Sequence, residues 1–251
     1  MRLQDKVAVV TGSGSGFGEG IASIFAREGA FVVVTDIDEA GGTRVADAIV
    51  AAGGAARFFR ADVTDGAAMR DLMAFATDSF GRLDILVNNA GTSHRRKPML
   101  DVTETEFERI FAVNVKGLYH TANAAVPIMR AAGGGAIVNI ASTGAIAPRP
   151  GLTWYNTTKG AVVTLTKSMA IELAPDRIRV NAINPVAGDT PLLATFMGED
   201  TPENREAFRA TVPLGRLSTP ADVGEAAAWL ASDAAALVTG VALEVDGGRC
   251  I

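Results

Sequence analysis

The stretch that decides the fold is VAVVTGSGSGFG, residues 7–18, close to the amino terminus. Its four leading apolar residues favour a strand buried on both faces, as in a parallel sheet covered by helices. The glycines that follow let the backbone turn sharply, and the apolar pattern from about residue 17 predicts a helix. Such a turn can approach a pyrophosphate, whose charge is favoured at a helix N-terminus. The stretch therefore predicts the first strand, turn and helix of a nucleotide-binding fold.

The glycine pattern departs from the strict G-x-G-x-x-G fingerprint, because position 17 is Phe17. The pattern that fits residues 11–18 is T-G-x-x-x-G-x-G, and a tight turn without a ligand remains the alternative. The residues that we expect to contact a bound cofactor here are Gly12, Ser15, Gly16, Phe17 and Gly18.

Strand-like and helix-like segments alternate along the rest of the chain. The apolar runs are Val7–Val10, Phe31–Val34, Ile85–Val87, Ala136–Ile140, Val180–Ile183 and Val241–Val245. The helical segments between them cover roughly 17–29, 39–52, 65–80, 104–131, 153–174 and 221–231. This alternation predicts an α/β protein, a single-domain Rossmann-type doubly wound parallel sheet with helices on both faces, spanning residues 1–251.

One segment, from about 186 to 212, breaks this rhythm. It contains Pro191 and Pro202, mixes apolar with charged residues, and has no strand. Long irregular insertions are usually functional, so we predict a substrate lid here, with an ordinary surface loop as the alternative.

Composition narrows the function classes. The 251 residues are 48% hydrophobic and 20% charged, which excludes a disordered chain. The net charge of −5 argues against nucleic acid and anionic membranes as partners, and no apolar run is long enough to span a membrane. The lone cysteine, Cys250, fits a reducing compartment, so we expect a cytoplasmic protein. With two histidines and one cysteine, no metal site is expected.

Two acidic residues follow strands at positions suited to an adenosine group. Asp36 lies 24 positions after Gly12, near the spacing of the acid that binds the ribose hydroxyls. Asp38 is the better candidate for the cap of the next helix, which leaves Asp36, with Ile37 beside it, for the ribose. Asp62 and Val63, expected just after the third strand, would lie at the adenine, with a plain turn as the alternative. An acid at position 36 would repel the 2′-phosphate of NADP, so we expect NAD as the cofactor.

A second constellation consists of Ser142, Tyr155 and Lys159. Tyr155 and Lys159 are four residues apart and share one face of a predicted helix. A nearby lysine cation lowers the pKa of a tyrosine, and we expect it to bring the pKa of Tyr155 from about 10 toward 7.

Together these residues resemble the short-chain dehydrogenase/reductase family over the whole chain. The resemblance rests on six motifs in order: T-G-x-x-x-G-x-G at 11–18, Asn88-Asn89-Ala90-Gly91, Asn114, Ser142, Tyr155-x-x-x-Lys159 and Asn181-Ala182-Ile183-Asn184-Pro185. It implies that Tyr155 is the general acid/base and that Ser142 hydrogen-bonds the substrate oxygen. It also implies that Lys159 binds the nicotinamide ribose and tunes Tyr155, and that Asn114 holds a water in a proton relay.

Further cofactor contacts follow from the same resemblance. They are Asn89, Ala90, Gly91, Tyr155, Lys159, Pro185, Gly188 and Thr190. Val186 stands where the family often has glycine, which puts the backbone geometry after Pro185 in doubt. The basic cluster His94-Arg95-Arg96-Lys97 either meets an anionic substrate group or is a solvated loop, and His120 has a packing or surface role.

The resemblance implies an NAD-dependent oxidoreductase that interconverts a small secondary alcohol (a sugar, a polyol or a hydroxy acid) and its ketone. The alternatives are a 3-oxoacyl carrier-protein reductase, against which Asp36 argues, and, more remotely, a non-catalytic nucleotide sensor. The long apolar faces of the helices at 104–131 and 153–174, together with the family layout, predict a homotetramer.

Overall fold

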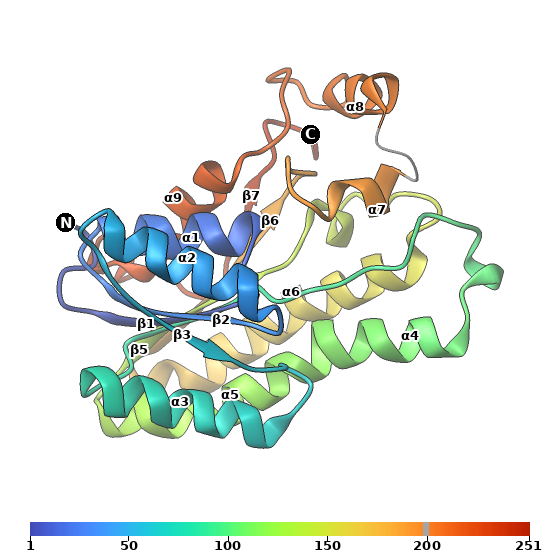
Figure 1. Ribbon diagram of the computed structural model, residues 1–251. Coiled ribbons are helices and arrows are strands. Elements are labelled where there is room, and N and C mark those ends of the chain that lie inside the picture. The colour runs from blue at the N-terminus through green and yellow to red at the C-terminus, as the bar shows by residue number, and fades with distance from the viewer. Residues whose placement is uncertain (198–200) are drawn as a thin grey trace.

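Seven parallel strands form one sheet in the computed structural model, which describes residues 1–197 and 201–251 (Figure 1). The strands are β1 (Val7–Thr11), β2 (Phe31–Asp36), β3 (Ala55–Arg60), β4 (Ile85–Asn88), β5 (Gly135–Ile140), β6 (Ile178–Pro185) and β7 (Ala242–Val245). Their order is β3-β2-β1-β4-β5-β6-β7. The predicted α/β class is confirmed, and the six apolar runs are all strands. The strand missing from those runs is β3, an edge strand whose partly exposed side chains break the apolar pattern.

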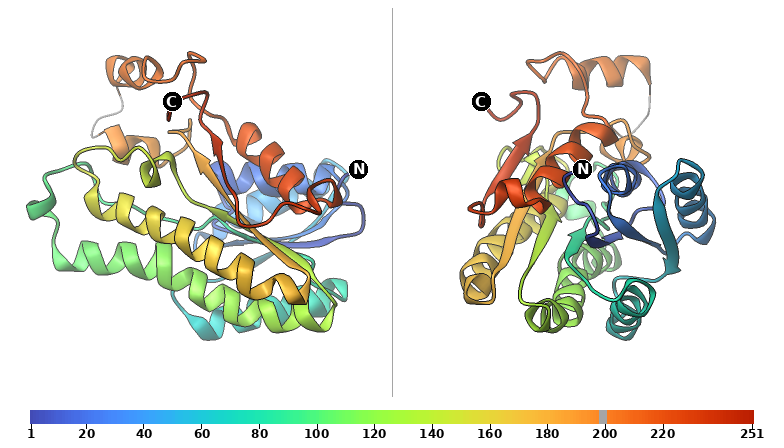
Figure 2. Two further views of the ribbon diagram at one scale, coloured as in Figure 1. Left: turned by 180° about the vertical axis from the view of Figure 1, so that it is seen from behind. Right: turned by 90° about the vertical axis from the view of Figure 1, so that its left-hand side faces the viewer.

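Helices cover both faces of the sheet. Their bounds are α1 (Gly16–Arg27), α2 (Glu39–Ala51), α3 (Gly66–Phe80), α4 (Glu104–Phe111), α5 (Gly117–Ala131), α6 (Thr153–Leu173), α7 (Leu193–Met197), α8 (Pro202–Arg209) and α9 (Pro220–Ala231). Figure 2 shows α1, α2 and α9 on one side of the sheet and α3, α5 and α6 on the other. Two separate clusters of buried apolar side chains match these two layers. The sheet is therefore doubly wound, as the alternation of strands and helices in the sequence predicted.

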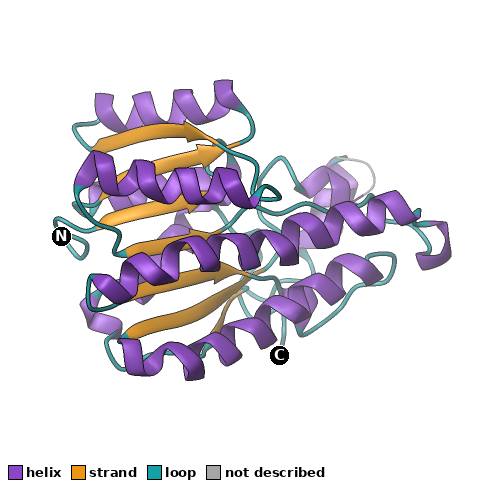
Figure 3. Ribbon diagram, turned by 90° about the horizontal axis from the view of Figure 1, so that it is seen from below, coloured by secondary structure: helices purple, strands orange, loops and turns teal. Residues whose placement is uncertain are grey.

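The strand order reverses between β1 and β4, which are neighbours in the sheet. From β1 the order continues outward to β2 and β3, and from β4 it continues outward on the other side to β5, β6 and β7. Every residue of β1 and of β4 is buried, because both faces of these central strands are covered. In parallel sheets of this kind, ligands bind beyond the carboxyl ends of the strands at such a reversal. Seen from below, all strand arrows point toward the end of the molecule where the loops gather (Figure 3).

The helix expected over 104–131 is continuous but not uniform. Between α4 and α5 lies η2 (Ala112–Lys116), a π-helical segment with i→i+5 geometry. Such π turns are rare and frequently occur at functional sites. Asn114 lies in the middle of it.

The segment 186–212 contains more regular structure than predicted. The described part forms α7 and α8, so the expectation of an irregular insertion is wrong there, although no strand is present within 186–197 or 201–212. Thr201 caps α8 by accepting a hydrogen bond from the Asn204 backbone N–H at 3.2 Å. Residues 198–200 of the predicted lid lie outside the described residues.

Candidate active site

The glycine turn after β1 lies at the carboxyl ends of the strands and is fixed there by hydrogen bonds. Gly12 has φ +62°, a conformation that favours glycine. The Asn89 side chain donates hydrogen bonds to the carbonyls of Thr11 (2.9 Å) and Gly12 (2.8 Å), which ties the turn to the end of β4. A Cβ added at Gly18 would lie 2.2 Å from the Gly12 carbonyl oxygen, so α1 can pack this close only with glycine there.

The N-terminus of α1 is free to bind an anion. Its N-cap residue, Ser15, has an extended backbone and makes no side-chain cap hydrogen bond. Backbone N–H groups at such an end lack partners within the helix, and their dipoles favour a negative charge. This end of the helix faces a cavity of about 710 Å³ that begins at the turn and ends at Tyr155. The turn therefore fits the pyrophosphate of a dinucleotide.

Asp36 ends β2 at the edge of this cavity. Its two carboxylate oxygens accept hydrogen bonds from the backbone N–H groups of Gly14 (2.9 Å) and Asp38 (3.0 Å). The cap of α2 is Asp38, whose carboxylate accepts from the Ala40 N–H at 3.2 Å, as predicted. Asp36 is thus held in place by backbone groups, with its carboxylate at the cavity wall.

Asp62 has a structural role as well as a place in the cavity wall. One of its oxygens accepts hydrogen bonds from both the N–H and the hydroxyl of Thr64, each at 2.8 Å. These hydrogen bonds stabilise a turn at 62–64, which was the alternative role of Asp62. Asp62 also lines the cavity beside Val63, so the two interpretations are compatible.

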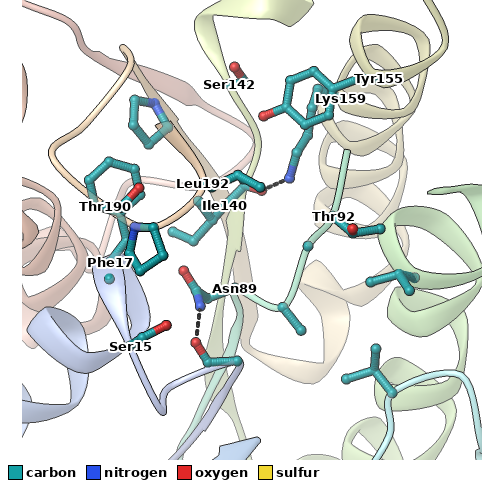
Figure 4. A pocket seen from close by; sticks show the side chains of 18 of the residues that line it. Ser15, Phe17, Asn89, Thr92, Ile140, Ser142, Tyr155, Lys159, Thr190 and Leu192 are labelled. Carbon is teal, nitrogen blue, oxygen red and sulfur yellow. Dashed lines mark hydrogen bonds between the residues drawn. The ribbon is translucent and has the colours of Figure 1, made fainter. Parts of the chain in front are cut away.

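Ser142, Tyr155 and Lys159 meet at the other end of the cavity (Figure 4). Ser142 follows β5, and its hydroxyl accepts a hydrogen bond from the Gly144 N–H at 3.0 Å. Tyr155 and Lys159 lie on consecutive turns of α6, with Lys159 Nζ 5.8 Å from the centre of the tyrosine ring. Nζ donates a 2.8 Å hydrogen bond to the Ile140 carbonyl at the end of β5. The predicted catalytic helix face is thereby anchored to the sheet.

Burial controls the protonation of both groups on α6. It raises the pKa of Tyr155 to about 12, although a hydrogen bond with Ser142 partly opposes the rise. It lowers the pKa of Lys159 to about 8, because a buried ammonium is desolvated. The expectation that Lys159 brings the pKa of Tyr155 toward 7 is therefore wrong for the free protein. Desolvation outweighs the attraction of a cation that lies near the ring.

Asn114 lies behind the cavity wall rather than in it. Its side-chain carbonyl accepts from the Thr92 N–H at 2.8 Å, and its amide donates to the Thr92 carbonyl (2.9 Å) and the Thr158 hydroxyl (3.0 Å). A Cβ added at Gly91 would lie 3.4 Å from Lys159 Nζ and 3.5 Å from Asn114 Oδ1, so both atoms face the same side of Gly91. The side chain joins the loop after β4 to α6. Its role in holding a water stays a prediction.

The segment after β6 closes against the glycine turn. A Cβ at Gly188 would lie 2.2 Å from the Phe17 ring, and a Cβ at Gly16 would lie 3.3 Å from the Thr190 side chain. Val186 keeps this segment in place despite replacing the common glycine. It is buried, its N–H donates to the Val245 carbonyl at 3.2 Å, and its carbonyl accepts from the Ser218 hydroxyl at 3.0 Å. The two ends of the predicted cofactor site are thus in contact.

All the predicted cofactor residues except Gly18 line this single cavity, as do Ser142, Tyr155 and Lys159. Gly18 acts through packing, and Asn114 through hydrogen bonds. Several lining residues were not predicted, and they lie at or after strand ends, on α4 and η2, or in the segment after β6: Ala61, Thr64, Thr92, Arg109, Ala112, Val113, Ile140, Ala141, Val186, Ala187, Pro191, Leu192 and Phe196. Position after a strand was a usable signal for part of this set, whereas Arg109 on α4, Ala112 and Val113 on η2 and Phe196 on α7 had none.

The basic cluster at 94–97 divides into separate roles. Lys97 pairs with Glu106 at 2.7 Å, Arg95 is exposed, and buried His94 contacts the Arg95 carbonyl through Nδ1 at 2.8 Å. Arg96 lines a second, smaller cavity. His120 packs against Tyr119, with ring centres 5.4 Å apart, which agrees with a packing role.

No cluster of three or more His, Cys, Asp or Glu side chains suited to a metal ion occurs in residues 1–197 and 201–251. None of the helices in the same ranges is long and apolar enough to cross a membrane.

Comparison with known proteins identifies the family. Residues 12–249 match a family model described as Enoyl-(Acyl carrier protein) reductase. The 4-formylbenzenesulfonate dehydrogenase of Comamonas testosteroni is 49% identical over the full length of both chains. The cis-4-hydroxycyclohexanecarboxylate dehydrogenase of Sinomonas cyclohexanicum is 40% identical over 97% of this chain and 96% of its own. The chain belongs to the short-chain dehydrogenase/reductase family, as its motifs predicted.

A solved structure gives the same result. The 3-ketoacyl-(acyl-carrier-protein) reductase of Brucella melitensis, complexed with NADH, is 50% identical and superimposes with a TM-score of 0.94, covering 99% of this chain and 100% of its own. The prediction of NAD as the cofactor agrees with the NADH held by that relative. The relatives named above are dehydrogenases or reductases, so the chain is a member of a family of oxidoreductases.

Proposed function

We propose that the chain is an NAD-dependent oxidoreductase that interconverts a secondary alcohol and its ketone by hydride transfer. The observation that carries the proposal is the single cavity that joins the glycine turn and Asp36 to Ser142, Tyr155 and Lys159. Backbone N–H groups at the start of α1 would hold the pyrophosphate, Asp36 the adenosine ribose, and Lys159 the nicotinamide ribose. The dinucleotide, when bound, supplies the carbon that accepts or gives the hydride.

The chain itself handles the proton. Tyr155 Oη gives its proton to the substrate oxygen during ketone reduction and takes it back during alcohol oxidation, while the Ser142 hydroxyl hydrogen-bonds the same oxygen. Burial holds Tyr155 protonated in the free protein, which favours its role as an acid. Oxidation needs the deprotonated form, so the rate of oxidation should rise with pH. Hydride transfer followed at 340 nm over a panel of cyclic and open-chain secondary alcohols, with NAD and NADP, tests the proposal.

A second candidate activity is the reduction of 3-oxoacyl thioesters. The Brucella melitensis relative is described as such an enzyme and holds NADH. A preference for NAD over NADP therefore does not separate the two candidates, and the argument from Asp36 against this activity loses its force. Reduction of acetoacetyl-CoA measured beside ketone reduction decides between them. A catalytically silent sensor would require that neither substrate class reacts.

We also propose a homotetramer in the cytoplasm. Tyr119 on α5 and Ile171 on α6 are 62% and 79% exposed, which supports the burial of these two helices between subunits. Cys250 has no disulfide partner, which fits a reducing compartment. Light scattering at micromolar concentration distinguishes the tetramer from a monomer of 25.9 kDa.

A further inference from the structure

A second cavity, of about 200 Å³, adjoins the proposed active site and is basic on one side and aromatic on the other. Its basic residues are Arg96, Arg149 and Arg249, and its rings are Phe196 and Phe208. They come from the loop after β4, the loop before α6 and the C-terminal tail, and from α7 and α8. Figure 1 shows the C-terminus at the same end of the molecule as α7 and α8. Segments far apart in the chain therefore build this cavity together.

None of the three arginines has an acidic partner in the part of the chain that the structure describes. Arg216, in contrast, pairs with Asp222 at 2.6 Å. The Arg249 Nε is buried without any hydrogen-bond partner among the described residues. The carboxylate of Asp246 accepts from the N–H groups of Gly248 (2.9 Å) and Cys250 (2.8 Å) and forms no ion pair with Arg249 among the described residues.

Arg149 shows most clearly that this arrangement is unfavourable without a ligand. Burial, together with the charges of Arg249 and Arg96, lowers its pKa below the usual value. Its guanidinium lies 4.4 Å from the centre of the Phe208 ring and donates to the Thr211 hydroxyl at 3.2 Å. Arg149 and Arg249 are half-buried and Arg96 is exposed, so three like charges without acidic partners meet at this cavity, and a bound anion would relieve their repulsion.

The loops that bear the arginines are held in position by backbone hydrogen bonds. The Arg96 N–H donates to the Thr195 carbonyl at 3.2 Å, beside Phe196. The Asn156 side chain on α6 donates to the Arg149 carbonyl at 3.0 Å. The Arg149 loop is therefore tied to the helix that carries Tyr155, which fixes this side of the cavity relative to that residue.

Phe196 is the link to the reaction. It lines both cavities, and its ring centre lies 5.0 Å from that of Tyr155. A substrate whose ring lies against Phe196 can place its reacting oxygen at Tyr155 and a second group at the arginines. Guanidinium groups favour carboxylates and sulfonates, which they bind through paired hydrogen bonds.

We propose that Arg96, Arg149 and Arg249 form a subsite for a carboxylate or sulfonate on the substrate, so that the substrate is a ring with its alcohol or carbonyl opposite an anionic group. This deepens the proposed function and rests on it. Two relatives are named for substrates of this description, 4-formylbenzenesulfonate and cis-4-hydroxycyclohexanecarboxylate. The inference for this chain is carried by its own arginines.

The test compares an anionic with a neutral substrate of the same ring. Oxidation of 4-hydroxycyclohexanecarboxylate and of cyclohexanol is measured with NAD for the wild type, Arg249→Gln, Arg96→Gln and the control Arg95→Gln. Arg95 is an exposed neighbour that does not line the cavity. We expect each cavity variant to raise KM for the carboxylate about ten- to a hundredfold, while kcat/KM for cyclohexanol stays within about twofold. Arg249→Lys should recover part of the loss, because it restores the charge.

Calorimetry with cyclohexanecarboxylate separates this proposal from the proposed function. If neither alcohol is oxidised, the proposed function fails, but binding of this probe to the wild type and not to Arg249→Gln still supports the subsite. Equal binding to both proteins, no binding to either, or equal effects of the variants on the two alcohols would overturn it. An increase in KM confined to acetoacetyl-CoA would assign the arginines to the phosphates of a thioester instead, and would also overturn it.

Discussion

Two regions of the molecule are built differently. The cofactor half is residues 7–91, and the substrate side consists of 92–98, 143–152, 186–197 and 201–219 with α7 and α8, and the tail 246–251. In the cofactor half, the binding residues lie at or shortly after the carboxyl ends of strands, and hydrogen bonds such as that from the Gly14 N–H to Asp36 hold them there. On the substrate side, hydrogen bonds join one loop to another segment. The Arg96 N–H donates to the Thr195 carbonyl, and the Arg149 guanidinium donates to the Thr211 hydroxyl. The comparison shows that the sheet sets where the cofactor binds, while contacts between loops set which substrate binds.

The largest expected effect comes from Tyr155, which lies where the two regions meet. Tyr155→Phe keeps the ring against Phe196 but removes the hydroxyl, so turnover should fall by about 10² to 10⁴ while cofactor binding persists. Steady-state kinetics and a cofactor titration by fluorescence measure the two quantities separately.

Tyr119→Phe is the matched control, because it deletes the same hydroxyl from a tyrosine on α5 that does not line the cavity and keeps the ring that we propose to lie between subunits. It should leave turnover unchanged. If Tyr155→Phe retained more than about a tenth of the wild-type rate, Tyr155 would not be the acid/base.

The next effect is a dependence of the free energy of unfolding on pH, which arises from Lys159. Burial lowers its pKa from 10.5 to about 8, so between these values the unfolded chain binds a proton that the folded chain does not. The free energy of unfolding therefore rises with pH across this window. The contribution is about 3 kcal/mol, at about 1.4 kcal/mol per pKa unit.

Urea unfolding of the wild type and of Lys159→Met at pH 7 to 10 measures this rise. The stability of the wild type should increase relative to that of the variant as pH increases. Above pH 10, Tyr155 acts in the opposite direction, because its raised pKa makes the folded chain retain a proton. Parallel curves for the two proteins between pH 8 and 10 would show that Lys159 is not desolvated.

Much of this architecture could be predicted from the sequence because its determinants are local. Four successive apolar residues in β1, a glycine turn and an apolar helix specify one strand–turn–helix unit, and Asp36 is recognisable by its distance from Gly12. Tyr155 and Lys159 are recognisable because one helical turn separates them. These patterns need no knowledge of distant segments.

The rest depends on contacts that no local pattern encodes. Arg96 was part of an ambiguous basic cluster until the fold placed it beside Arg149 and Arg249. The pKa of Tyr155 was predicted in the wrong direction because spacing reports the nearby lysine but not the burial of the ring. The strand β3 was expected before Asp62 but had no apolar run to define its bounds, because an edge strand exposes part of its side chains.

A smaller effect on the cofactor half is expected from Asp36→Ala. The carboxylate is fixed by backbone N–H groups at the cavity edge and should repel the 2′-phosphate of NADP. At about 4 Å this repulsion is about 4 kcal/mol at an effective dielectric of 20, and solvent should reduce it to about 1.5–3 kcal/mol. The preference for NAD, measured as a ratio of kcat/KM values, should fall about ten- to a hundredfold.

Asp38→Ala removes the same charge two residues away, where the side chain caps α2 outside the cavity, and should keep the preference for NAD. Arg44 donates to the Gly14 carbonyl at 3.0 Å and is neutralised by Glu19. Glu19→Gln added to Asp36→Ala should therefore free a cation and move the preference further toward NADP. An Asp36→Ala protein that still prefers NAD as strongly as the wild type would show that this acid does not face the ribose.

The smallest effect is expected on the substrate side, in the motion of α7 and α8. Leu193 and Met197 pack with Leu217 in a small cluster that is separate from the two cores on the sheet faces. Opening such a cluster exposes little apolar surface, so these helices should exchange amide hydrogens faster than α6 in the free protein. Binding of both NAD and a secondary alcohol should slow exchange in 193–197 and 202–209 by about tenfold, equivalent to about 1.4 kcal/mol, because closure excludes water from Tyr155.

Hydrogen exchange followed by mass spectrometry compares these segments with α6 as an internal reference. Protection that requires both ligands would mean that the loops of the substrate side complete the site only when the cofactor half is filled, whereas unchanged exchange would mean that they form a static wall.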